Sequence, residues 1–140
     1  MYYIPIILTI IANVFYHITQ RYTSEKVNPY FSLSITYIIA FIVSVIMYVF
    51  TKKNVAIVEE VKAINFATPL LGVCIVFLEL GFLLAYRAGW NVGTASIIST
   101  VVVTILLVPI GIFFFHEGIT LKNIVGIVLC IIGIVLMNSK

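Results

Sequence analysis

Residues 94–115, TASIISTVVVTILLVPIGIFFF, are the stretch of sequence that decides the fold. The stretch contains no Asp, Glu, Lys or Arg and is rich in Val, Ile, Leu and Phe. A helix of about 20 apolar residues is long enough to cross the hydrocarbon core of a bilayer, which is roughly 30 Å thick. The stretch therefore predicts a transmembrane helix.

The composition of the whole chain indicates the same surroundings. Of its 140 residues, 63% are hydrophobic and only 9% are charged, whereas a soluble domain carries roughly a quarter charged residues. Most of the surface must therefore face hydrocarbon. The length leaves room for five or six spans but not for a separate soluble catalytic domain. The dispersed net charge of +3 argues against a nucleic-acid partner.

Apolar runs of similar length recur along the chain and predict an all-α integral membrane protein with five transmembrane helices. Proline stands where a helix tolerates it, at the start of the second and third runs, and Thr120 is a candidate N-cap for the last run. The connections are short, so consecutive helices should be antiparallel neighbours. The predicted spans are residues 3–22, 30–50, 68–88, 94–115 and 121–137, in one domain that covers residues 1–140.

The longer connection between the second and third spans carries a different pattern. Val55, Val58, Val61 and Ile64 recur every three residues with charged residues between them. This spacing suits a short amphipathic helix over residues 54–66 that lies in the membrane interface. A solvated loop is the alternative.

The basic residues give no preferred orientation in the membrane. Five spans place the connections alternately on the two sides, and each side receives four basic residues, so the positive-inside rule does not choose between them. The chain could therefore insert in both orientations. One side carries Arg21, Lys26, Arg87 and Lys140, and the other carries Lys52, Lys53, Lys62 and Lys122.

Glu79 is the clearest functional candidate because it is a carboxyl group at the centre of the third span. A charge at that depth costs roughly 2.5–3.5 kcal/mol on insertion scales, so the side chain should face a cavity or a partner. There it could exchange a proton or bind a substrate. A hydrogen-bonded packing residue is the alternative. Tyr86 lies seven residues further on, on the same helix face.

Polar faces on the other spans supply further candidates for a substrate or proton site. His17 could titrate near neutral pH, or it could simply hydrogen-bond to a neighbouring helix. Ser and Thr in spans often bond to their own backbone, so their faces are weaker evidence. The candidates from these faces are Asn13 and His17 in the first span, Tyr37 in the second, and Ser96 and Thr100 in the fourth.

Small residues mark two faces where helices could approach closely. Gly81 and Ala85 lie on the side of the third span away from Glu79, and Gly126 and Gly133 align with Cys130 on the last span. These four positions, Gly81, Ala85, Gly126 and Gly133, are candidates for packing or for a dimer interface. Both cysteines stand among apolar residues, and no ligand spacing, nucleophile–base constellation or phosphate loop predicts a metal, a cofactor or an enzyme.

Three segments carry a resemblance to a known family. They are GFLLAYRAGW at residues 81–90, FHEGIT at 115–120 and GIVLCIIG at 126–133, within residues 71–138. This half of the chain resembles the EamA-type domain of the drug/metabolite transporter superfamily, to which the small multidrug resistance proteins also belong. The first half is similar only in the number and length of its helices.

The resemblance implies an architecture and a kind of function. EamA-type transporters have ten spans in two inverted five-span repeats, so this chain resembles one repeat, and an antiparallel homodimer would rebuild the ten-helix transporter. Small multidrug resistance proteins use a glutamate in the first helix. The corresponding position here is Asn13, so their cation–proton exchange is not implied through that residue.

The leading hypothesis is a secondary transporter or exporter of a small metabolite or drug-like solute, possibly coupled to protons, in a prokaryotic cell (inner) membrane. Its expected partners are the lipid bilayer, a small-molecule substrate and a second copy of the chain. One alternative is a small non-transporting subunit that assembles with another membrane protein. Another is a component of a lipid-carrier flippase.

Overall fold

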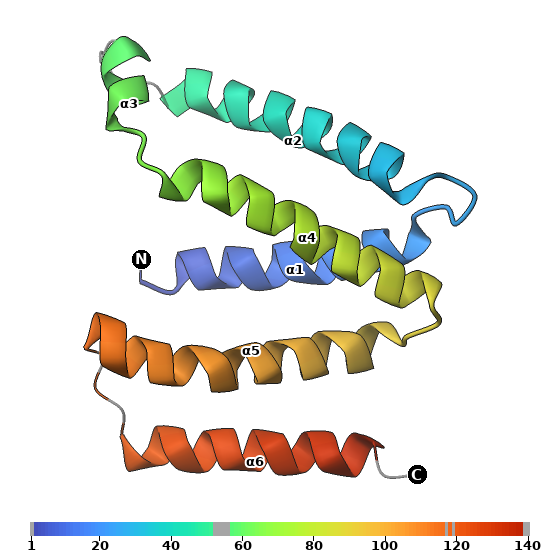
Figure 1. Cartoon of the computed structure of the whole chain (residues 1–140), viewed down its shortest axis with the longest axis vertical. Coiled ribbons are helices and arrows are strands. Elements are labelled where there is room, and N and C mark those ends of the chain that lie inside the picture. Colours follow the sequence, from blue (N-terminus) through green and yellow to red (C-terminus); the bar gives the residue numbers. More distant parts are fainter. Residues whose placement is uncertain (1, 52–56, 117, 119, 139–140) are drawn as a thin grey trace. The chain divides into compact units, whose positions relative to one another are not determined.

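A computed structural model describes residues 2–51, 57–116, 118 and 120–138. In these residues the chain is all-helical and has no strand. The predictions that concern Lys52, Lys53, Val55, Glu117, Ile119 and Lys140 lie outside the described residues. The helices are α1 (Ile4–Tyr22), α2 (Pro29–Thr51), α3 (Ile57–Ala63), α4 (Ala67–Arg87), α5 (Val92–Phe115) and α6 (Leu121–Asn138) (Figure 1).

The bounds of the five long helices agree with the predicted apolar runs to within two residues at each end. Three of them, α2, α4 and α5, are long and apolar enough to cross a membrane. The described apolar part of α6, Leu121–Leu136, is shorter. In α1 the second half carries Asn13, His17, Gln20 and Arg21, which lowers its mean hydropathy. The helices are thus confirmed, and a full membrane crossing has clear support for three of them.

Local sequence signals explain where two of the helices begin. The side chain of Asn28 accepts a hydrogen bond from the backbone N–H of Tyr30 at 2.9 Å, just before α2 starts at Pro29. The hydroxyl of Thr120 accepts a bond from the backbone N–H of Asn123 at 3.4 Å and donates to the Asn123 side chain at 2.9 Å. Thr120 therefore caps α6 as predicted.

The connection after α2 contains a helix, as the three-residue apolar spacing predicts. α3 covers Ile57–Ala63, within the predicted range of 54–66, of which residues 54–56 lie outside the described part. Val58 and Val61 are both exposed on α3, with fractions of 63% and 59%. These residues are available to contact lipid at the interface.

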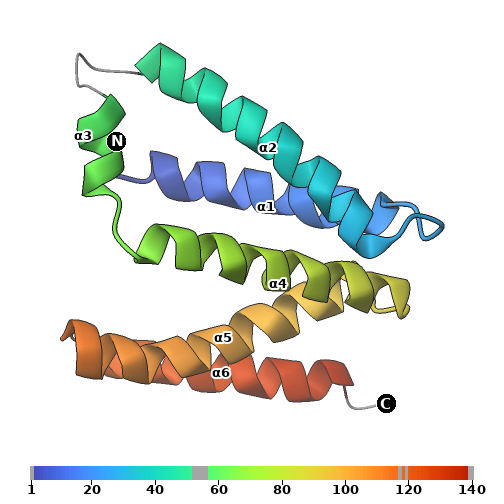
Figure 2. The ribbon, with the colours of Figure 1, turned by 45° about the horizontal axis from the view of Figure 1, so that its top comes forward.

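The chain forms two compact units. The first contains residues 18–88 and is called the α2–α4 unit; the second contains residues 1–17 and 89–140 and is called the α5–α6 unit. Within the first, α2 and α4 lie side by side in antiparallel directions, with α3 in the connection between them (Figures 1 and 2). Within the second, α5 and α6 form an antiparallel hairpin.

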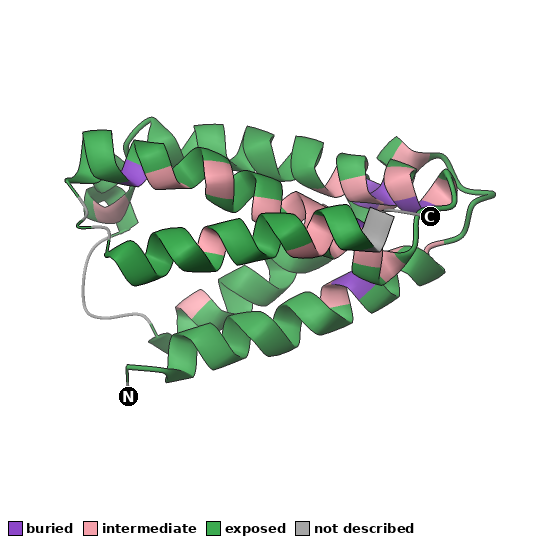
Figure 3. Cartoon of the chain, turned by 90° about the horizontal axis from the view of Figure 1, so that it is seen from below, coloured by how far each residue is buried: buried purple, intermediate pink, exposed green. Residues whose placement is uncertain are grey.

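Apolar side chains remain largely on the surface, as Figure 3 shows along all the long helices. Phe41 and Phe113, for example, are 67% and 77% exposed, whereas Leu33, Leu83 and Tyr86 are among the few buried side chains. A surface of this kind is stable only where hydrocarbon replaces water as the solvent. The burial pattern therefore agrees with a membrane protein.

Candidate functional site

Glu79 lies near the middle of α4 and is partly buried. Its carboxyl group interacts with the hydroxyl of Tyr37, which is on the neighbouring helix α2. Both residues belong to the α2–α4 unit. Sequence analysis selected these two residues separately, as members of polar faces on different helices, and the structure brings them together.

The Tyr37 hydroxyl is shielded from solvent and has no hydrogen-bond partner of strict geometry among the described residues. Its interaction with Glu79 is therefore a loose one, in which the phenolic O–H is the donor and the carboxyl is the acceptor. A shielded donor without an ideal partner is available to a third group, such as a water molecule or a substrate atom. The pair can consequently hold a polar ligand between α2 and α4.

The end of α1 is fastened to the backbone turn that carries Glu79. The Nε2 atom of Gln20 donates a hydrogen bond to the backbone carbonyl of Glu79 at 2.9 Å. Gln20 and Glu79 both lie in the α2–α4 unit. The bond fixes the position of the Glu79 backbone and leaves the carboxyl group to interact with Tyr37.

Two arginines fasten the end of α4 next to this site. Arg21 donates to the backbone carbonyl of Tyr86, and the Arg87 guanidinium donates to the carbonyls of Ser24 and Val27 at 2.9 and 2.8 Å. Sequence analysis counted both arginines only as charges on one side of the membrane. The signal for their role is that each stands in the last turn of a helix, where a cation can reach unpaired carbonyls.

Tyr86 and His17 occupy buried positions. Tyr86 is only 1% exposed, and its ring lies 6.0 Å from that of Phe82, centroid to centroid. His17 is 8% exposed and contacts the Tyr16 ring edge-on at 5.0 Å. Asn13, in contrast, is exposed on α1. Burial of its ring makes Tyr86 a packing residue beside the Glu79–Tyr37 pair.

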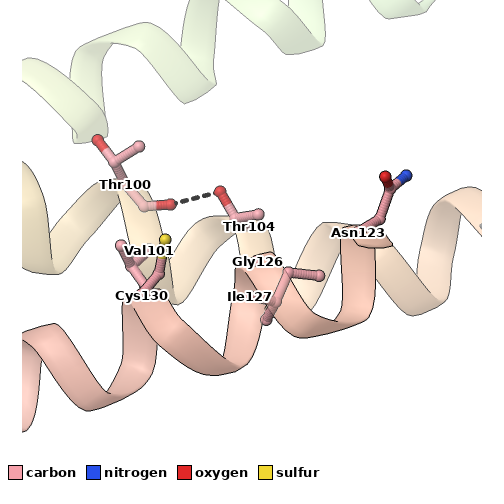
Figure 4. A pocket seen from close by; sticks show the side chains of 7 residues that line it. All are labelled: Thr100, Val101, Thr104, Asn123, Gly126, Ile127 and Cys130. Atoms are coloured by element: carbon pink, nitrogen blue, oxygen red, sulfur yellow. Dashed lines mark hydrogen bonds between the residues drawn. The ribbon is translucent and has the colours of Figure 1, made fainter. Parts of the chain in front are cut away.

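Ser96 and Thr100 lie on α5, in the other unit. Ser96 is partly buried, and Thr100 lines a hollow of about 320 Å³ between α5 and α6 (Figure 4). Apolar atoms make up nearly all of the lining, and the Thr104 hydroxyl there donates to the Thr100 carbonyl of its own helix at 2.8 Å. The hollow is lined by Thr100, Val101, Thr104, Asn123, Gly126, Ile127 and Cys130.

The small residues singled out for packing have open space beside them. A Cβ atom added at Gly81, Gly126 or Gly133 would meet nothing within 4 Å, and Ala85 is partly buried. Gly126 also lines the hollow toward α5. Both cysteines are free, and no cluster of His, Cys, Asp and Glu that could hold a metal ion occurs in the described part of the chain.

Comparison with known proteins assigns the family. The model of the EamA-like transporter family matches residues 1–139. The chain belongs to this family. It is therefore an integral membrane protein of a transporter type, as its apolar helices also indicate.

A relative of this EamA-like chain occurs in Methanocaldococcus jannaschii. That uncharacterized protein is 32% identical to the chain over 138 residues, which cover 95% of each of the two sequences. No solved structure matches the chain significantly. The family assignment thus confirms the resemblance seen in the sequence.

Proposed function

We propose that the chain is a secondary transporter that exports a small metabolite or drug-like solute, with the Glu79–Tyr37 pair as its site for substrate or proton. The observation that carries the proposal is the position of this pair. An acidic group lies near the middle of an apolar helix, and no basic residue of the described chain contributes to its interactions. Such groups in spans commonly serve transport.

The chemistry of the pair suits an exchange of charge. In a dry site the Glu79 carboxyl is most stable when protonated, and water or a cationic ligand stabilises the carboxylate. Tyr37 can donate to the carboxylate in one state and to a ligand in the other. Binding of a solute and release of a proton at the same carboxyl would couple the two movements.

A second copy of the chain would complete the transporter. Five helices of this length are too few to enclose a solute, and the relative, which is matched over 95% of its own sequence, is about as long as this chain. The four basic residues on each side permit an antiparallel arrangement. We propose an antiparallel homodimer with five spans from each copy, in a prokaryotic cell membrane.

A ligand-stabilisation screen tests the site. The purified protein is heated with pools of metabolites and drug-like compounds, and each compound that raises the melting temperature is tested for uptake and counterflow in proteoliposomes at several pH values. Glu79→Gln retains the shape of the side chain but cannot titrate. We expect normal expression, with loss of ligand stabilisation or of the pH dependence of transport.

The control for this screen is Glu59→Gln, which removes an exposed carboxyl from α3. If the Glu79 variant transports with unchanged pH dependence, Glu79 is a packing residue. If neither protein binds any solute but both co-purify with another membrane protein, a non-transporting subunit becomes the better explanation.

A topology reporter tests the antiparallel dimer. The reporter is fused after Lys140 and its signal is measured on both sides of the membrane. We expect signal on both sides, and two extra lysines beside Lys53 should shift the ratio toward one side. A signal on one side only would exclude dual insertion and require a parallel dimer or a different partner.

A further inference from the structure

Helix α2 carries a second tyrosine that lies beside a carboxyl group. The Tyr48 hydroxyl interacts with the carboxyl of Glu60, which is on α3. As at Tyr37, this hydroxyl is shielded from solvent and has no partner of strict hydrogen-bond geometry among the described residues. The α2–α4 unit thus contains two tyrosine–glutamate pairs, one in the middle of the helices and one at the end where α3 begins.

Both tyrosines lie on one face of α2. Tyr48 follows Tyr37 by 11 residues, which is almost three whole helical turns, and Ser44 lies between them on the same face. The face therefore leads from the Glu60 carboxyl at the membrane surface to the Glu79 carboxyl near the middle of α4. It is the one polar face of an otherwise strongly apolar helix.

The orientation of α3 is unusual for an interfacial helix. Charged residues of such helices normally point to water while the apolar residues enter the membrane. In α3, Glu60 is the only residue of Ile57–Ala63 that is partly buried, whereas Val58, Glu59 and Val61 are exposed. Glu60 is therefore turned toward α2 although water is available to it.

Few other charged or titratable groups face these two carboxyls. Near Glu60 they are Tyr48 on α2 and, on α3 itself, the exposed Glu59 and Lys62. Near Glu79, Tyr37 faces the carboxyl from α2, and Gln20 of α1 bonds only to its backbone. The two glutamates are thus the acidic groups at the two ends of the polar face.

We propose that Tyr48 and Glu60 form an outer proton-exchange site through which Glu79 gains and loses its proton. This inference rests on the proposed proton coupling at Glu79. In the inward direction the Glu60 carboxylate takes a proton from hydronium and becomes a carboxylic acid. The proton then passes along the α2 face to the Glu79 carboxylate, so that Glu60 is again charged and Glu79 is neutral.

Water must take part in this transfer. Tyr48 and Tyr37 are separated by about 16 Å along the helix at 1.5 Å per residue, which is too far for one hydrogen bond. The Ser44 hydroxyl between them donates to the Phe41 carbonyl at 2.8 Å, and its oxygen remains free to accept from a water molecule. Glu60 accordingly positions the proton at the surface and does not contact Glu79.

Infrared difference spectroscopy after a pH jump tests the proposal with the proton as the probe. The protein is reconstituted in lipid, and the carbonyl band of the protonated carboxyl that disappears in Glu79→Gln is assigned to Glu79. In Glu60→Gln and Tyr48→Phe we expect the same final amplitude of this band but a rise that is about tenfold slower or more, since a charged hydrogen-bonding group is lost. Glu60→Asp should restore most of the rate.

Glu59→Gln is the matched control, because it removes the neighbouring, exposed carboxyl of the same helix. It should leave the rate unchanged. Equal rates in the native, Glu60→Gln and Glu59→Gln proteins would overturn the outer site while leaving Glu79 as a proton site. A slowing of similar size in both variants would reduce the effect to general surface charge and also overturn it. If no band responds to pH, the proton coupling at Glu79 fails together with this inference.

Discussion

The two antiparallel helix pairs of the molecule are held in different ways. In the α2–α4 unit, side chains cross between elements through polar groups: Tyr37 reaches Glu79, and Arg87 reaches the carbonyls of Ser24 and Val27. In the α5–α6 hairpin, a hollow lined almost wholly by apolar atoms separates parts of the two helices. The hydroxyl of Thr104 there bonds to its own helix.

This difference separates chemistry from packing. In lipid, apolar side chains gain little by leaving the solvent for a neighbouring helix, so association depends on close packing and on polar contacts. The α2–α4 unit uses polar contacts and contains the ionisable site. The α5–α6 hairpin offers small residues, Gly126 and Gly133, with open space beside them. We therefore expect variants of the first unit to change stability and transport, and variants of the second to change assembly.

The largest loss of stability is expected for Arg87→Ala. The variant removes two charge-assisted hydrogen bonds to the loop after α1, at 2.9 and 2.8 Å. Because the side chain is only partly buried, the free energy of unfolding should fall by about 2 kcal/mol. Thermal unfolding in detergent and protease cleavage within residues 23–28 measure the effect.

Lys26→Ala is the control for Arg87, since it removes an exposed positive charge from the same loop. It should change stability by less than about 0.5 kcal/mol. If both variants have equal effects, net charge and not the pair of carbonyl contacts stabilises this end of α4.

A smaller effect, on assembly alone, is expected for Gly133→Leu. A Cβ atom at this position meets nothing within 4 Å in the described chain, so the helix hairpin should tolerate the larger side chain. If Gly133 packs against a second copy, the dissociation constant in lipid should rise about tenfold. Val128→Leu, an exposed position on the opposite side of α6, is the control. An unchanged dimer would remove Gly133 from the interface.

Tyr37→Phe should cost about 1 kcal/mol or less in stability, because the loose hydroxyl interaction is lost while the ring stays. Transport or ligand binding should be affected more than stability, since the hydroxyl is available to a ligand. The melting temperature and the affinity for any compound found in the screen are the two measurements. Unchanged affinity for every ligand would restrict the site to Glu79.

The helices were predictable from the sequence because their signals are local. Apolar runs, prolines and the cap at Thr120 define their ends without any knowledge of neighbours. Glu79 was also predictable, since a charge within an apolar run is conspicuous in one dimension. A full crossing by α1 was less so, because the polar face that suggested function also lowers the hydropathy of the helix.

The partners of the site could not be predicted in the same way. That Tyr37 meets Glu79, and that Gln20 and Arg21 bind α4 carbonyls, depends on how helices far apart in sequence are placed together. Hydroxyl groups misled in the other direction. Periodicity puts Thr100 and Thr104 on one polar face, but an i to i−4 bond makes one side chain satisfy itself on its own helix.

The smallest effect is expected for Thr104→Val, and it tests the comparison most directly. The Thr104 hydroxyl donates to the Thr100 carbonyl four residues earlier, and the side chain is exposed. Because that carbonyl already accepts the helical backbone bond, loss of the hydroxyl should change the free energy of unfolding by less than about 0.5 kcal/mol. Thermal unfolding and transport assays should match those of the native chain. A loss as large as that of Tyr37→Phe would mean that hydroxyls of the α5–α6 hairpin also act between helices, and the division between a polar and an apolar helix pair would be wrong.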